Sequence, residues 1–262
     1  MTAPTLDIRR IAGRASITSA THAGRFARFL AMSAKGLAEP RIWVPRAWEE
    51  AYRVGIGSLG IVLLISAFAG AVTALQAGYQ FTGSIPYYVV GTLIVSSIVL
   101  ELGPVLTALV LAGRVGARYA AELGTMRVTE QIDALESLGR APSSHLVVPR
   151  VLAGLVVIPA LTMVANAVGI LAGWASVRLV LPVSDIDFVY GAQIYWRPWD
   201  AWYSLIKAVA FSLSNTTISC YMGFSTEQGA EGVGRSTTTA VVASSVTILL
   251  LDVVLTKLLL ST

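Results

Sequence analysis

The sequence predicts an all-α integral membrane protein with an N-terminal interfacial helix, five transmembrane helices and a short cytoplasmic helix. Charged residues make up 13% of its 262 residues, about half the share of a typical soluble domain, and the mean hydropathy is +0.70. Several uncharged runs are long enough to cross a bilayer, which takes about 20 residues. No alternation of apolar and polar residues persists, so strands are not expected.

The first two transmembrane helices are predicted within one long run. No charged residue occurs between Arg53 and Glu101, which is too long for a single crossing. The middle of this run, QAGYQFTGSIP at 76–86, is polar and contains glycine and proline, so it predicts a turn. We therefore expect one helix at 54–77 and a second at 87–113 that continues helically toward residue 124.

Three further crossings follow along the chain. The first occupies the uncharged run at 150–178, and the next covers 201–224 with Lys207 inside it. The last covers 237–260 and contains Asp252. The two charged residues make these last crossings less regular than the others, but the apolar runs around them are long enough to span.

The distribution of cations predicts the orientation. Residues 1–53 hold nine lysines and arginines and the 114–150 connection holds five, whereas the 78–86 turn holds none. Because cytoplasmic loops carry the excess of such cations, the N-terminus and the 114–150 connection are predicted to be cytoplasmic, and five crossings place the C-terminus outside. The tyrosines and tryptophans of the 178–200 loop then form an outer interfacial belt.

The N-terminal region, residues 1–52, predicts a cytoplasmic basic tail ahead of a membrane domain at 53–262. No compact apolar core of a signal peptide precedes Val54. Within the tail, apolar residues at 24–37 recur at helical spacing with cations on the other faces. This pattern predicts an amphipathic helix in the inner interface, and a frayed basic tail is the alternative.

The segment GAEGVGRS at 229–236 differs by one residue from a phosphate-binding loop, because Arg235 stands where the pattern G-x-x-x-x-G-K-[ST] requires lysine. A working loop of this kind follows a strand and uses that lysine on the phosphates. We interpret the segment as a flexible turn between the last two crossings, with Ser236 and Thr237 capping the final helix. No ATP site is expected here.

Other catalytic chemistry is not indicated. His22 and His145 lie outside the predicted crossings, Cys220 is the single cysteine, and no nucleophile–base pair or cluster of metal ligands is apparent. We therefore expect a chain that is not an enzyme, with no catalytic residue, no metal and no cofactor.

The cytoplasmic connection predicts a short amphipathic helix at about 128–138. Thr129 can cap it, and Gly139 and Pro142 can end it. Its acidic and amide residues favour the first turn, and its apolar residues fall at i, i+4 and i+7. The acidic and amide residues are Glu130, Gln131 and Asp133, and the apolar residues are Val128, Ile132 and Leu135. A helix that merely covers the membrane face and a helix that inserts into a groove of a partner are both consistent with this pattern.

Small residues between the second crossing and this helix form two stripes. Gly113, Ala117 and Ala121 lie on one, and Gly116, Ala120 and Gly124 lie on the other. Such stripes let helices approach closely in lipid. They predict either packing within the chain or a dimer contact.

Three charged residues are singled out within the predicted crossings, namely Glu101, Lys207 and Asp252, while Lys257 lies near the end of the last crossing. A charge at the bilayer centre costs about 2.5–3.5 kcal/mol on insertion scales, so such groups usually pair. We predict a cluster of the three that joins the second, fourth and fifth crossings. Separate snorkelling to the interface and a proton relay are the alternatives.

An ordered series of motifs resembles the MlaE/YrbE permease family, the membrane subunits of ABC transporters that move lipids in Mla and Mce systems. The resemblance covers about 55–260. The motifs are ELGP at 101–104, AGR at 112–114, AELGTM at 121–126, EQIDAL at 130–135, VVPR at 147–150 and DVVLTK at 252–257. Relatives often carry a basic residue just before the first motif, where this chain has Leu100.

The resemblance implies a transport subunit in a bacterial inner membrane. Its expected partners are a separate ABC ATPase, a second permease copy forming a homodimer, an MCE-domain protein and a membrane lipid. The cytoplasmic helix would be the coupling helix that docks into the ATPase. Lipid would bind between the protomers near the outer side, at Leu75, Gln76, Tyr79, Glu101 and Leu102.

The identity of the lipid and the direction of transport stay open at this point. An ion- or proton-coupled secondary transporter that uses Glu101, Lys207 and Asp252 is the alternative from another class. It would predict internal inverted repeats, which the sequence does not show.

Overall fold

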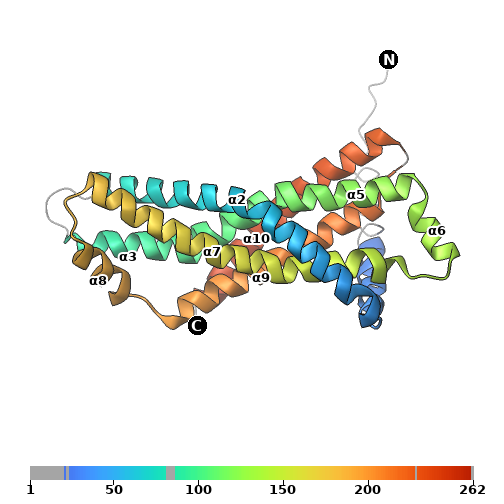
Figure 1. The fold of residues 1–262 in the computed structure, drawn as a ribbon, viewed down its shortest axis with the longest axis horizontal. Helices are drawn as coiled ribbons and strands as arrows, with labels where there is room; N and C mark the ends of the chain where they lie inside the picture. Colours follow the sequence, from blue (N-terminus) through green and yellow to red (C-terminus); the bar gives the residue numbers. More distant parts are fainter. Residues whose placement is uncertain (1–20, 22–23, 81–85, 228, 261–262) are drawn as a thin grey trace, which may run out of the picture.

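The computed structural model describes residues 21, 24–80, 86–227 and 229–260, which form a bundle of long helices (Figure 1). No strand occurs among these residues, so the all-helical prediction is confirmed. Figure 1 shows α6 at one end of the long axis and α8 at the other. The long helices connect the two ends.

The elements follow one another closely along the chain. A helix at 24–36 precedes them, and three of them are π-helical turns (η) inside longer helices. In order, they are α2 (Pro40–Gln80), α3 (Tyr88–Ser97), η1 (Ile98–Leu102), α4 (Gly103–Leu111), η2 (Ala112–Gly116), α5 (Ala117–Val128), α6 (Gln131–Ser137), η3 (Ser143–Val147), α7 (Val148–Val180), α8 (Asp185–Ile194), α9 (Pro198–Phe224) and α10 (Ala230–Leu260).

Four helices in the described part of the chain are long and apolar enough to cross a membrane. They cover Pro40–Tyr79, Tyr88–Val128, Ser143–Val180 and Ala230–Leu259. They contain the first, second, third and fifth predicted crossings, and the predicted continuation of the second helix toward residue 124 is present. The protein is therefore a multi-pass membrane protein.

The fourth predicted crossing, 201–224, lies within α9, which ends at Phe224. This helix has 27 residues, about 40 Å at 1.5 Å per residue, but it is not among the four spans above. Its polar side chains explain the difference, because they lower the mean hydropathy of the helix, and they are buried against neighbouring helices. They include Ser204, Lys207, Ser212, Asn215, Thr216 and Ser219.

Several helix boundaries differ from the sequence prediction. The first helix starts at Pro40, well before residue 54, because charged residues end an apolar run without interrupting backbone hydrogen bonds. It also continues to Gln80 into the predicted 76–86 turn, of which residues 81–85 lie outside the described residues. The 178–200 loop contains a helix, α8, whose first turn is capped by Ser184 accepting from the amide of Asp187 at 3.1 Å.

The most extensive helix contact joins α2 to α7, and Figure 1 shows the two side by side. Gly70 lies so close to α7 that a Cβ atom there would be 1.9 Å from the carbonyl oxygen of Gly169. Glycine permits this close approach of two backbones, which is how helices pack tightly in lipid. A second close contact joins α5 to α9.

Candidate functional site

The predicted membrane charges form one cluster. Lys207 on α9 is fully buried, and its Nζ lies 2.8 Å from Glu101 Oε1 and 2.8 Å from Asp252 Oδ1. Glu101 belongs to the second span and Asp252 to α10, so the lysine joins three helices. The snorkelling alternative is wrong for Lys207, because the side chain has no exposed surface.

The position of Pro104 explains why Lys207 also donates a hydrogen bond to a backbone carbonyl of the second span. Pro104 has no N–H, and its ring crowds the carbonyl four residues earlier, which belongs to Leu100. The helix widens into the π turn η1 at this point, and Lys207 Nζ donates to the oxygen of Leu100 at 3.2 Å. The cation therefore donates to a backbone oxygen that lacks the usual donor four residues later.

Two residues that sequence reasoning missed complete the membrane charge cluster. The hydroxyl of Tyr203 lies 3.4 Å from Glu101 Oε1 and 3.2 Å from Thr256 Oγ1, and its ring lies 4.7 Å from Lys207 Nζ. Thr256 Oγ1 is 3.3 Å from Glu101 Oε1. Their spacing in the sequence could have indicated them, because Tyr203 precedes Lys207 by one helical turn and Thr256 follows Asp252 by one turn, so each lies on the same helix face as its charged neighbour.

The five predicted lipid-pocket residues lie in two places. Leu75, Gln76 and Tyr79 are exposed along α2, with 88% of Tyr79 accessible. Glu101 and Leu102 lie in η1 and are half-buried. The α2 residues present an open surface, so a pocket at this position needs a second surface to close it.

The two small-residue stripes differ in what they contact. Ala120 is fully buried, and a Cβ atom at Gly116 would lie 2.7 Å from both Asn215 and Ser219 of α9. Gly124 is similarly close to Thr226. This stripe packs within the chain. Gly113, from the other stripe, is exposed with nothing near its Cβ position, and Ala117 is half-buried.

The short helix predicted at about 128–138 starts differently from the prediction. Glu130 adopts a left-handed conformation with φ 58°, which interrupts the helix and separates α5 from α6. Thr129 does not cap α6, because its hydroxyl donates backward to the carbonyl of Thr125 at 2.8 Å. Val128 consequently ends α5 and does not share a helix with Ile132.

The apolar side of α6 is used within the chain. Ile132 is 1% exposed and Leu135 is half-buried. The outward side of α6 is polar and begins at Glu130, Gln131 and Asp133, all exposed. Any partner of this helix would therefore meet the polar face.

The near phosphate-binding segment at 229–236 is mostly helical. Because α10 begins at Ala230, Ser236 and Thr237 lie inside the helix and do not cap it. The hydroxyl of Thr237 donates to the carbonyl of Val233 at 2.7 Å. The predicted flexible turn was wrong for these residues, and a helix interior cannot wrap its amides around a phosphate.

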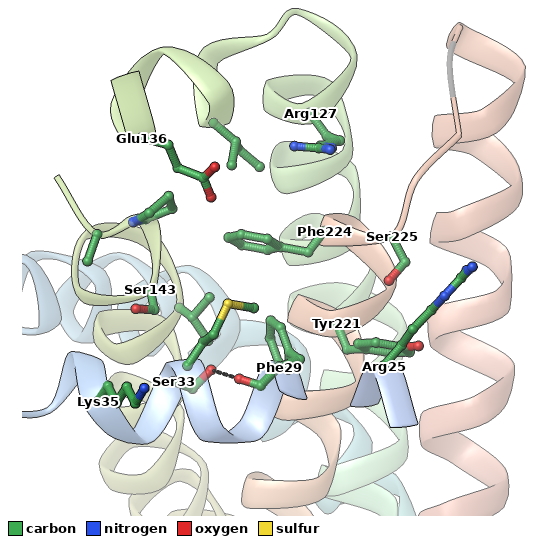
Figure 2. Close-up of a pocket in the computed structure, with 15 residues that line it drawn as sticks. Arg25, Phe29, Ser33, Lys35, Arg127, Glu136, Ser143, Tyr221, Phe224 and Ser225 are labelled. Carbon is green, nitrogen blue, oxygen red and sulfur yellow. Dashed lines mark hydrogen bonds between the residues drawn. The ribbon is translucent and has the colours of Figure 1, made fainter. Parts of the chain in front are cut away.

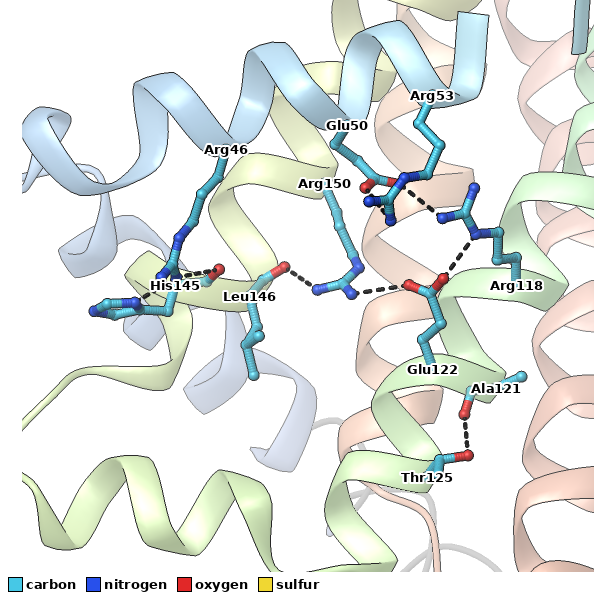
Figure 3. A network of polar contacts seen from close by, with 10 residues as sticks. All are labelled: Arg46, Glu50, Arg53, Arg118, Ala121, Glu122, Thr125, His145, Leu146 and Arg150. Atoms are coloured by element: carbon cyan, nitrogen blue, oxygen red, sulfur yellow. Dashed lines mark hydrogen bonds and ion pairs between the residues drawn. The ribbon is translucent and has the colours of Figure 1, made fainter. Parts of the chain in front are cut away.

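A second polar network joins α2, α5 and α7 near the end of the bundle that carries α6 (Figure 3). Glu122 lies between two arginines, with Arg118 Nε at 2.7 Å and Arg150 Nη2 at 2.9 Å. Glu50 of α2 lies 3.9 Å from Arg118 and 3.6 Å from Arg53. The network ties the helices on both sides of α6 to each other and to α2.

A proline again frees a carbonyl at the start of α7. Pro149 follows His145 by four residues, and Arg46 Nη1 donates to the His145 carbonyl at 3.1 Å while also contacting its Nδ1 (Figure 3). His145 lies within the π turn η3, which ends at Val147. As at Leu100, a cation from another helix satisfies the freed oxygen.

Replacing Arg150 with glutamine is expected to lower the free energy of unfolding by about 1–2 kcal/mol, since a charge-assisted hydrogen bond to Glu122 is lost. Chemical unfolding in mixed micelles measures it. Arg53→Gln is the matched control, because that side chain is 58% exposed and should cost about 0.5 kcal/mol or less. Equal losses in the two variants would contradict this role of Arg150.

A family model described as Permease MlaE matches residues 47–258. A probable ABC transporter permease protein of Rickettsia prowazekii (strain Madrid E) is 37% identical over 253 residues, covering 97% of this chain and 98% of the relative.

Two further relatives come from photosynthetic organisms. A probable ABC transporter permease protein of Synechocystis is 40% identical over 196 residues, covering 75% of this chain and 74% of the relative. Protein TRIGALACTOSYLDIACYLGLYCEROL 1, chloroplastic, of Arabidopsis thaliana is 39% identical over 209 residues, covering 80% of this chain and 60% of the relative.

Proposed function

Because the chain belongs to the MlaE permease family, we propose that two copies of it form a lipid-binding pathway across a bacterial inner membrane. As an ABC transporter permease, the chain is not itself catalytic and implies an ATPase partner. One relative bears the name of a galactolipid, which supports a lipid as the substrate. An MCE-domain protein on the outer side is the proposed acceptor or donor.

The proposed topology has five crossings, with α9 as the fourth. In Figure 1, α9 runs between the α8 end and the α6 end of the bundle, and it is long enough to span. Its polar residues face other helices, as polar residues in membrane helices usually do. The cation distribution supports a cytoplasmic N-terminus and a cytoplasmic α6, with the C-terminus on the other side of the membrane.

The observation that carries the proposed mechanism is the position of α6. It joins the second span to the third, and buried Ile132 fixes it to the rest of the chain. A force applied to α6 by an ATPase would therefore reach both spans. The Glu122 network couples the same two spans beside it.

Further from α6 along the second span, the turn η1 carries Glu101 and Leu102. We propose that rocking of this span against α2 changes the shape of the surface formed with Leu75, Gln76 and Tyr79, which a second permease copy closes. The exposed Gly113 and half-buried Ala117 are the proposed packing contacts of that copy. ATP-driven motion is thereby converted into a difference in lipid affinity between two states.

The ion-coupled alternative has less support. Lys207 is fully buried and paired with both carboxylates, as expected of a structural contact between helices. Membership of an ABC permease family also assigns the energy source to ATP.

Co-purification tests the coupling role of α6. Gln131→Arg with Ala134→Arg adds two cations to an exposed face that otherwise carries Glu130, Asp133 and Glu136. A complementary partner surface would be cationic, so the ATPase recovered with the tagged permease should fall at least about tenfold, a cost of 1.4 kcal/mol or more.

The matched control is Glu231→Arg, which makes the same change of charge in the exposed first turn of α10. It should leave ATPase recovery unchanged. If the double variant folds, as judged by its elution profile, and retains the ATPase at the wild-type level, α6 is not the docking element. Ile132 is unsuitable as a probe because its substitution would disturb the chain itself.

A further inference from the structure

A cavity of about 440 Å³ opens at the cytoplasmic end of the bundle. It lies between the helix at 24–36, α6, η3 and the end of α9 (Figure 2). Its lining is mainly apolar and includes five large apolar or aromatic side chains from the 24–36 helix, η3 and α9. They are Phe29, Met32, Val147, Tyr221 and Phe224.

Cations surround this apolar interior. Arg25, Lys35 and Arg127 line its edge, with Glu136 as the carboxylate. Arg127 is already paired with Asp133 at 2.5 Å. Within the described residues, neither Arg25 nor Lys35 forms an ion pair, so their charges are available to a ligand.

A second cavity of about 370 Å³ adjoins the first and is more polar. The two share Arg25, Tyr221 and Ser225 as lining residues. The second cavity adds Arg235 and, as its one carboxylate, Glu227. Figure 2 shows the Arg25 side chain reaching toward α10, away from the apolar interior. Arg25 therefore stands at the boundary between an apolar and a cationic compartment.

We propose that the two cavities together bind an anionic phospholipid of the cytoplasmic leaflet. An acyl chain would occupy the apolar cavity, and the phosphate would lie between Arg25 and Arg235. Both volumes fall within the range of small-molecule sites, about 300–1,000 Å³. Basic pockets at the cytoplasmic ends of membrane helices have the chemistry to hold anionic head groups, and the two arginines outnumber the single carboxylate Glu227.

This site differs from the proposed transport pathway, which lies at α2 and η1 toward the outer side. Its occupant would contact α6 directly, because Ile132 and Glu136 line the apolar cavity. It would also hold the 24–36 helix against α9 through Phe29, whose ring already packs on Tyr221 with centroids 5.6 Å apart. A lipid here would thus stabilise one position of the proposed coupling helix.

Native mass spectrometry of the transporter, purified with its ATPase from nanodiscs of equal phosphatidylglycerol and phosphatidylcholine, tests the site. The wild type should retain phosphatidylglycerol in preference to phosphatidylcholine. Arg25→Gln and Arg235→Gln should each lower its retention about fivefold, because each removes a cation that lies directly beside the bound phosphate. Arg28→Gln is the matched control, because Arg28 is exposed on the same helix but does not line either cavity.

Two further arms separate the sources of the phosphate. Glycerol 1-phosphate added in excess should not displace the lipid, because it lacks an acyl chain. Met32→Asp, which places a charge in the apolar cavity, should lower retention as strongly as Arg25→Gln. Displacement by glycerol 1-phosphate would overturn the lipid assignment in favour of a free phosphate site. Equal retention of the two lipids, or an equal loss in Arg28→Gln, would overturn the site altogether.

Discussion

Lys207→Met is expected to lower the free energy of unfolding by about 3–5 kcal/mol, the usual loss when one partner of a buried ion pair is removed. The lysine is fully buried and contacts Glu101 and Asp252 at 2.8 Å each. Without it, two carboxylates and the free carbonyl of Leu100 would lack their cation. The loss is measured by unfolding in mixed micelles or by the yield of folded protein from membranes.

Neutralising the acids provides the control. Glu101→Gln with Asp252→Asn in the Lys207→Met background should restore a large part of the stability, because no unpaired charge is left between the helices. A triple variant that is as unstable as Lys207→Met would show that the lysine acts through packing alone. If Lys207→Met is as stable as the wild type, the membrane charge cluster does not stabilise the fold.

Gly70→Val is expected to destabilise the bundle by about 3 kcal/mol, at the upper end of the usual cost of overpacking. A Cβ atom there would lie 1.9 Å from the backbone oxygen of Gly169. Backbone cannot rotate away as a side chain does, so α2 and α7 would have to separate along their contact. Thermal unfolding in detergent would report the change as a lower midpoint.

Gly60→Val is the matched control on the same helix, because nothing lies within 4 Å of its Cβ position. Both substitutions make the same change in helix propensity. The difference between their unfolding midpoints therefore reports the effect of the close contact between α2 and α7 alone. If the two variants unfold at the same temperature, close packing at Gly70 does not hold α2 against α7.

The parts of the fold that composition determines were predictable. Apolar runs predicted five membrane crossings, and four of them correspond to long apolar helices in the described part of the chain, because a bilayer core excludes charge and requires every backbone group to be bonded within its helix. The contact of Lys207 with Glu101 and Asp252 followed from the same exclusion, since few partners are available inside a membrane. Motif order was specific enough to identify the family that the comparisons later matched.

Helix ends and surface helices were predicted less well. Ser236, Thr237 and Thr129 are good capping residues by type, yet Ser236 and Thr237 lie inside α10 and Thr129 follows the end of α5. The hydroxyls of Thr237 and Thr129 each donate to the carbonyl four residues earlier. Hydroxyl residues make both kinds of bond, and the choice depends on where the neighbouring helix begins. The helix α8 was missed because its sequence, rich in aromatic residues, also fits an interfacial loop.

Sequence alone thus determined the all-helical membrane class, the family and the pairing of the membrane charges, because hydrophobic exclusion acts on each segment separately. Only the tertiary structure decided which way Ile132 faces, that Tyr203 and Thr256 join Glu101, and that Arg25 and Arg235 border one pair of cavities. Those features depend on the rotation and crossing of helices far apart in the chain. Many side chains set that geometry together, and no local pattern records it.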